Sequence, residues 1–339
     1  MTTELAAYFD RIGFEGPPKA DGATLYALCR AHTNSIPFEN LDVQLGRKTA
    51  RSQSEIHDKL VSRQRGGWCY EQNALMGWAL GEIGFDVTRL VAGVMRAQAG
   101  DGQLGNHLCL LVRLEGEDLL VDVGFGSSLL GPMPIMTGAR VDAPFEVGLT
   151  QVDDGYWRFW ESAHSDPFSF DFKIAPADQS VLDAKRIWQE TDPASPFVQN
   201  LVVRRRDGVL HHTLRGKVLT TATIVGLDSR ELATADELVD VLDDVFGLDM
   251  PEAASLWPAI LLLPDFRDSG RDNAADAFAV GIVAAEYRDI GRAGVFCLVR
   301  DGIEDFGRTG LGCQHLLVIR DAYGDRCRLP GNGHRRQDH

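Results

Sequence analysis

The hydrophobic period of this chain changes at Phe85, and that change limits the folds open to it. Before Phe85, apolar residues recur at helical spacing in residues 24–32, in residues 54–64 and in a segment that begins near Cys69 and stops at Gly84. After Phe85 the period is that of strands. We expect strands at residues 87–95, 107–114, 119–123, 156–161 and 168–174. The pattern predicts an α+β fold, with a helical domain in residues 1–85 and a small β-barrel or sandwich in residues 86–184.

Residues 185–262 mix both kinds of structure. Residues 201–206 and 209–214 are expected to form a hairpin around an Asp207-Gly208 turn. A helix is expected to begin after Thr234, with Glu237 at the capping-box position, and to end before Gly247. We therefore expect an α/β domain here.

Residues 263–339 form an atypical C-terminal extension. From residue 265 onward the chain has no lysine, 11 arginines and three of its six cysteines. Residues 295–299 and 316–319 could be strands. The extension could be an added module, part of a lid, or a readthrough or frameshifted segment, and its composition favours the last of these.

The composition excludes several classes of function. The formal net charge of −15 argues against nucleic acid and anionic membrane surfaces as partners. No apolar run is long enough to span a bilayer, and the first residues lack the basic region of a secretory signal. The six cysteines show no zinc-site spacing, so we expect free thiols, no metal and a cytoplasmic location.

The segment Arg65–Asn73 (RGGWCYEQN) is the most informative in the chain. Gly66 and Gly67 allow a sharp turn, and Cys69 follows at the expected start of a helix. Unpaired N–H groups and the helix dipole favour an anion there, so the thiolate form of Cys69 is favoured. Cys69 is therefore a candidate nucleophile, although a lone cysteine at such a position is more commonly a small buried hydrophobe.

His107 and Asp122 lie on two expected strands joined by a turn at residues 115–118. If the loop has two or four residues, both side chains lie on one face of the sheet, within one diagonal step. A three-residue loop without a bulge would place them on opposite faces. Asp122 lies in an apolar run, where an unpaired carboxylate would be costly, and His107 is the available partner. Each residue alone also fits a structural role, but with Cys69 they form a Cys-His-Asp array.

With these motifs assembled, the sequence resembles the arylamine N-acetyltransferase family. The resemblance rests on Arg65–Asn73, on Ile36–Leu41 (IPFENL), on Asn106-His107 and on Val121–Gly126 (VDVGFG), and it covers about residues 1–250. It implies a helical domain, a β-barrel and an α/β lid around a cysteine-protease-like core. It also implies ping-pong transfer of acetyl from acetyl-CoA, through Cys69, to an arylamine, arylhydroxylamine or arylhydrazine nitrogen.

The resemblance also implies that Phe38 and Phe125 line the acceptor pocket, and Val94 is expected to face the same cleft. Backbone N–H groups of Gly126, Ser127 and Ser128 are candidates for binding coenzyme A. Residues 204–206, three consecutive arginines, could contact its phosphates, but adjacent strand residues alternate in direction, which favours a solvated hairpin.

Three alternatives stay open at this point. An amide synthase on the same scaffold would move a larger acyl group from a carrier thioester, and pocket volume would separate it from an acetyltransferase. A hydrolase with the same triad would release acid without an amine. A binding module would have an unreactive Cys69. The oligomeric state, monomer or homodimer, is equally open.

Overall fold

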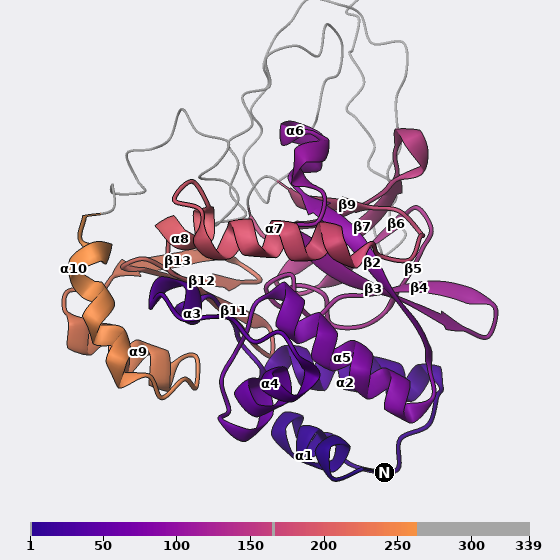
Figure 1. The fold of residues 1–339 in the computed structure, drawn as a ribbon, viewed down its shortest axis with the longest axis horizontal. Coiled ribbons are helices and arrows are strands. Elements are labelled where there is room, and N and C mark those ends of the chain that lie inside the picture. The colour runs from indigo at the N-terminus through magenta and orange to yellow at the C-terminus, as the bar shows by residue number, and fades with distance from the viewer. Residues whose placement is uncertain (1, 165–166, 263–339) are drawn as a thin grey trace, which may run out of the picture. The chain divides into compact units, whose positions relative to one another are not determined.

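Helices form almost all of the regular structure before Phe85 (Figure 1). The computed structural model describes residues 2–164 and 167–262. The helices are α1 (Thr3–Ile12), α2 (Gly22–Ser35), α3 (Leu41–Gln44), α4 (Gln53–His57), the π-helix η1 (Asp58–Ser62) and α5 (Cys69–Ile83). The one short strand among them is β1 (Phe38–Glu39).

The ends of these helices follow local capping rules. Thr2, Asp21 and Ser52 accept backbone N–H groups at the starts of α1, α2 and α4. Gly84 ends α5 in the left-handed conformation, as the sequence predicts. The helix expected over residues 54–64 is instead a short α-helix followed by a π-helix, in which Lys59 is buried.

An eight-stranded antiparallel sheet follows. Its strands are β2 (Asp86–Val94), β3 (His107–Leu114), β4 (Glu117–Val121), β5 (Met133–Pro134), β6 (Gly138–Asp142), β7 (Phe145–Gln151), β8 (Trp157–Ser162) and β9 (Phe168–Phe172). Their order is β5-β4-β3-β2-β9-β8-β7-β6. In the described part of the chain β5 and β6 are its two unpaired edges, and Arg140 of β6 donates to the carbonyls of Gly131 and Pro132 just before β5. The sheet is therefore curled, with aromatic and aliphatic side chains packed inside it.

The remaining elements begin with α7 (Gln179–Thr191), which runs across the boundary expected at residue 184. The others are α8 (Pro196–Gln199), β10 (Val202–Asp207), β11 (Leu210–Arg215), β12 (Val218–Thr223), β13 (Gly226–Glu231), α9 (Ala235–Asp244) and α10 (Trp257–Ile260). Short helical segments are α6 (Arg96–Ala99), η2 (Asp101–Gln103), η3 (Asp153–Gly155) and η4 (Pro251–Leu256). β1 and β10 to β13 form a second antiparallel sheet in that order, so the first segment supplies a strand to the third.

The start of α9 and the turn between β10 and β11 were both expected from the sequence. Thr234 does cap α9 by accepting the N–H of Glu237. The β10–β11 turn is shifted, because Asp207 pairs with Leu210 and the loop is Gly208-Val209 rather than Asp207-Gly208. Gly208 has a φ of 58°, which an L-residue adopts at a cost.

Helix α5 packs against β2 and β3, so one helix joins the helical segment to the curled sheet (Figure 1). None of the helices in residues 2–262 is long and apolar enough to cross a bilayer. The extension 263–339, its expected strands at 295–299 and 316–319, and Cys297, Cys313 and Cys327 lie outside the described residues.

Candidate active site

Cys69, His107 and Asp122 stand at the ends of three elements that meet in the core. Cys69 is the first residue of α5, His107 is the first residue of β3, and Asp122 directly follows β4. All three are buried, with 4%, 2% and 4% of their surfaces exposed. Cys69 lies where the helix has N–H groups without intrahelical acceptors.

The imidazole of His107 contacts the carboxylate of Asp122, with 2.6 Å between Nε2 and Oδ2. The β3–β4 loop has two residues, since Leu114 pairs with Glu117, and this is the register in which the two side chains share a face. Burial alone would lower the pKa of His107. The Asp122 carboxylate, with a further contribution from Cys69, outweighs burial and raises the pKa of His107 to about 10. Because Nε2 faces Asp122, Nδ1 is left for the sulfur.

Asn73 fixes the carboxylate of Asp122. Its Nδ2 donates to Asp122 Oδ1 at 2.8 Å and to the Leu108 carbonyl at 2.6 Å, and its Oδ1 accepts the N–H of Val123 at 3.0 Å. The Gly124 N–H also donates to Asp122 Oδ1, at 2.8 Å. This role of Asn73 is not among those expected from the sequence. Its position four residues after Cys69, on the same face of a helix, is the signal that could have found it.

A cleft of about 40 Å³ opens beside Cys69 and His107. Its lining includes Phe38, Val94, Phe125 and Gly126, together with Asn106, Gly124, Phe168, Phe197, Val202 and Arg204. The ring of Phe125 stacks on that of Phe168, with 5.0 Å between centroids, and meets His107 edge-on at 5.3 Å. The cleft therefore has aromatic walls next to the sulfur and the imidazole.

Ser127 and Ser128 lie under the surface and outside this lining. Their carbonyls accept hydrogen bonds from Arg206 Nη1 at 3.1 and 2.9 Å. Of the three residues expected to contact coenzyme A, the structure brings only Gly126 to the cleft.

The expectation of a solvated arginine hairpin is wrong. Arg204 and Arg206 point to the same face of β10 and are 7% and 0% exposed, while Arg205 points to the other face and donates to the Val245 carbonyl. Arg206 is satisfied by carbonyls from residues 127, 128, 142 and 143, about sixty residues or more away in the sequence. Such distant acceptors cannot be inferred from strand alternation.

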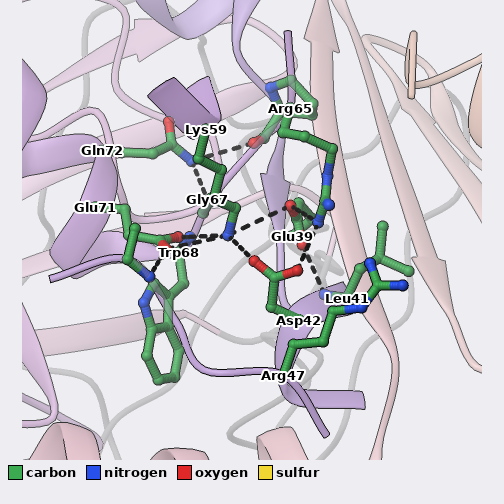
Figure 2. Close-up of polar contacts among 12 residues, drawn as sticks. Glu39, Leu41, Asp42, Arg47, Lys59, Arg65, Gly67, Trp68, Glu71 and Gln72 are labelled. Carbon is green, nitrogen blue, oxygen red and sulfur yellow. Dashed lines mark hydrogen bonds and ion pairs between the residues drawn. The ribbon is translucent and has the colours of Figure 1, made fainter. Parts of the chain in front are cut away.

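A buried cluster of charged side chains supports the loop before Cys69 (Figure 2). Lys59 Nζ lies 2.7 Å from Asp42, 2.9 Å from Glu71 and 3.6 Å from Glu39. Arg65 Nη2 lies 2.7 Å from Glu39 and 3.3 Å from Asp42. Burial opposes the charge on Lys59, but the three carboxylates raise its pKa. Arg65 thus contacts carboxylates of the scaffold, and it does not line the cleft.

Glu71 links this cluster to the start of α5. Its Oε2 accepts the N–H of Trp68 at 3.2 Å, and its Oε1 accepts that of Ala50 at 3.0 Å. A Cβ on Gly67 would lie 2.6 Å from Glu71 Oε2, so the glycine allows the loop to pass the carboxylate. The cluster therefore fixes the residues on either side of the turn that leads into Cys69.

Within the described residues, no group of three or more His, Cys, Asp or Glu side chains is arranged to hold a metal ion. Cys29, Cys69 and Cys109 are free and buried. Burial raises the pKa of Cys29 to about 12 and also raises that of Cys109.

Comparisons with known proteins identify the class. An N-acetyltransferase family model matches residues 21–255. The arylamine N-acetyltransferase of Mycolicibacterium smegmatis is 34% identical over 261 residues, which cover 75% of this chain and 95% of that protein. Arylamine N-acetyltransferase 2 of Mus musculus is 30% identical over 277 residues, covering 73% and 94%. These matches define an acyltransferase enzyme.

Solved structures similar to this chain are arylamine N-acetyltransferases as well. The arylamine N-acetyltransferase of Salmonella typhimurium superimposes with a TM-score of 0.70 at 28% identity, covering 78% of this chain and all of that one. The Mycobacterium marinum enzyme in complex with CoA gives 0.69 at 29% identity, covering 76% and 98%. The chain belongs to the arylamine N-acetyltransferase family, which confirms the resemblance found in its motifs.

Proposed function

We propose that this chain transfers acetyl from acetyl-CoA to the nitrogen of an arylamine, arylhydroxylamine or arylhydrazine, by a ping-pong route through a Cys69 thioester. The observation that carries the proposal is the buried contact between His107 and Asp122, beside a cysteine at a helix start and in a cleft with aromatic walls. Cys69 is the nucleophile, His107 the general base and acid, and Asp122 the group that orients the imidazole.

In the first half-reaction, His107 holds the proton of Cys69 as an imidazolium, and the Cys69 thiolate attacks the acetyl carbonyl carbon of acetyl-CoA. Negative charge develops on the carbonyl oxygen, and N–H groups at the start of α5 are the donors placed to stabilise it. The bond from carbon to the coenzyme sulfur then breaks. The imidazolium returns its proton to that sulfur, which leaves coenzyme A and S-acetyl-Cys69.

In the second half-reaction, the aryl nitrogen attacks the thioester carbon while His107 accepts a proton from it. The carbon–sulfur bond to Cys69 breaks, the N-acetyl product leaves, and the pair of Cys69 thiolate and His107 imidazolium is restored. Transfer between two thioesters is nearly balanced in free energy, so the weakly basic amine meets an already activated acyl group. Asp122 stabilises the imidazolium form of His107 in both half-reactions.

The cleft supports a small acyl group. A volume of about 40 Å³ suits a group of a few heavy atoms, since about 10–15 Å³ holds one water molecule. The aromatic acceptor must enter the same space, so the volume alone does not separate acetyl from the larger acyl group of an amide synthase. Phe38, Phe125 and Val94 would contact the aromatic acceptor. Gly126, the one of the three candidates that lines the cleft, would contact coenzyme A, and a CoA complex of a related structure supports that donor.

We further propose a layout of three functional segments. Residues 1–85 carry the nucleophile, residues 86–184 form a barrel-like domain with His107 and Asp122, and residues 185–262 form a lid that begins within α7.

Two-substrate kinetics test the route. With acetyl-CoA and phenylhydrazine, double-reciprocal plots should be parallel, since coenzyme A leaves before the acceptor binds. Intersecting lines would contradict the ping-pong order. Release of free acetate at the same rate without any acceptor would favour the hydrolase.

A further inference from the structure

Arg204 lies in the cleft that contains the proposed nucleophile. It is paired with Phe38 across the β1–β10 ladder, so both side chains point to the same face of the sheet. Both line the cleft together with Cys69 and His107, although Arg204 is only 7% exposed. A buried cation thus faces the space where the acyl group and its acceptor would meet.

The guanidinium of Arg204 is not satisfied by the protein. Within residues 2–164 and 167–262, its side chain makes no hydrogen bond or ion pair, and its Nε is buried without a partner. Its neighbours differ, since Arg205 donates to the Val245 carbonyl and Arg206 to five carbonyls. The described contact of Arg204 is with the ring of Phe168, whose centroid lies 6.0 Å from Cζ.

The surroundings of Arg204 leave its charge only partly compensated. The opposite charge that acts on it is Glu161, which lies beyond ion-pair distance and has an unpaired Oε2. Burial raises the pKa of Glu161 to about 7, which weakens its negative charge near neutral pH. His211, whose Nε2 contacts the Gly126 carbonyl at 2.6 Å, stays neutral because burial lowers its pKa to about 3.

Gly126 holds the guanidinium against the wall of the cleft. A Cβ at this residue would lie 2.6 Å from Arg204 Nη1 and 2.7 Å from its Cδ. Gly126 also has a φ of 80°, which favours glycine. The backbone of the loop that follows Asp122 therefore lies against the Arg204 side chain and limits the orientation of its guanidinium.

Building on the proposed function, we propose that Arg204 binds a carboxylate carried by a substrate in this cleft, either on the aromatic amine or on the acyl group. An unsatisfied buried guanidinium is costly, and a carboxylate fits its two-pronged donor geometry. The phosphates of coenzyme A lie at the far end of the pantetheine arm from the thioester, so they do not reach a group beside Cys69. The chain would therefore select an anionic substrate over its neutral analogue.

Two pairs of substrates separate the two sources of the carboxylate. With acetyl-CoA as donor, kcat/KM is measured for 4-aminobenzoate and for neutral 4-aminobenzamide. With 4-aminobenzamide as acceptor, it is measured for malonyl-CoA and for neutral butyryl-CoA. Each pair gives a ratio, anionic over neutral, for the wild type and for each variant, so intrinsic differences in reactivity cancel between proteins.

Arg204→Gln should lower one of the two ratios by roughly 10- to 100-fold, as expected for a lost hydrogen bond to a charged group. The pair that changes identifies which substrate carries the carboxylate. Arg205→Gln, on the opposite face of the same strand, is the matched control and should keep both wild-type ratios. Arg204→Lys keeps the charge without the fork; it should lower the same ratio by less and serves if the glutamine variant does not fold.

If Arg204→Gln shows the same anionic-over-neutral ratio as the wild type for both substrate pairs, this inference is overturned. If the wild type acetylates 4-aminobenzamide while Arg204→Gln keeps both ratios, the proposed function stands and only the role of Arg204 fails. If the wild type acylates no aromatic amine from any donor, the proposed function itself fails.

Discussion

At the scale of single residues, the site depends on how Asp122 is held. Asn73 and the Gly124 N–H both donate to its Oδ1, which leaves Oδ2 for His107. A carboxylate constrained on one oxygen orients the imidazole through the other. Four groups from α5, β3 and the loop after β4 therefore determine which ring nitrogen faces Cys69.

Asp122→Asn tests this arrangement. Asparagine keeps an oxygen for the two N–H donors but presents no negative charge to His107, so kcat should fall on the order of 10⁴-fold, as in serine triads. Asp118→Asn is the matched control, because Asp118 lies on β4 in an exposed pair with Arg113 and should leave kcat unchanged. Near-normal activity in Asp122→Asn would show that the assigned role is wrong.

The pH dependence of alkylation tests His107. Its pKa is raised to about 10, so the imidazole stays protonated at all lower pH values, including neutral pH, and can stabilise a thiolate on Cys69. The rate of Cys69 alkylation by iodoacetamide should fall little from about pH 8.5 to about pH 7, whereas an ordinary thiol loses roughly tenfold or more. Peptide mapping separates Cys69 from the other cysteines. His107→Gln should restore the ordinary profile, and an ordinary profile in the wild type would contradict the account.

At the scale of elements, the start of α5 depends on a buried charge cluster. Lys59 comes from a π-helix, and its three carboxylate partners come from β1, α3 and α5. The cluster thus joins one strand and three helical elements around the turn before Cys69 (Figure 2).

Lys59→Met should lower the free energy of unfolding by about 3–5 kcal/mol, because Glu71 would then lose its cationic partner while Glu39 and Asp42 would share only Arg65. The matched control is Arg63→Met. Arg63 forms a more than half-exposed pair with Asp58 in the same segment, and its loss should change stability by at most about 1 kcal/mol. Urea unfolding measures both, and equal effects would contradict the role of the cluster.

Local rules predicted the elements better than the contacts between them. The His107–Asp122 contact was predictable because it depends on the parity of one hairpin loop. The burial of Lys59, Arg204 and Arg206 was not, because their partners are distant in sequence and isolated cations favour solvent. Strand β6 was missed because its residues are largely exposed and show no apolar alternation.

At the scale of the whole molecule, the family match ends near residue 255, and 261 aligned residues cover 95% of the Mycolicibacterium smegmatis relative. All the residues that we place in the site precede residue 262. A chain truncated after residue 262 should therefore keep acetyl transfer from acetyl-CoA to phenylhydrazine at a rate close to that of the full chain. Loss of activity in a truncated protein that still melts cooperatively would show that the extension takes part.

The central claim is that Cys69 carries the acyl group between the two substrates. Intact-mass measurement after mixing the protein with acetyl-CoA, followed by peptide mapping, tests it most directly. The account predicts one added acetyl group, located on Cys69, that disappears when phenylhydrazine is added and does not form in Cys69→Ala. An unmodified protein that still acetylates phenylhydrazine, or an acetyl group on another residue that the amine removes, would contradict it.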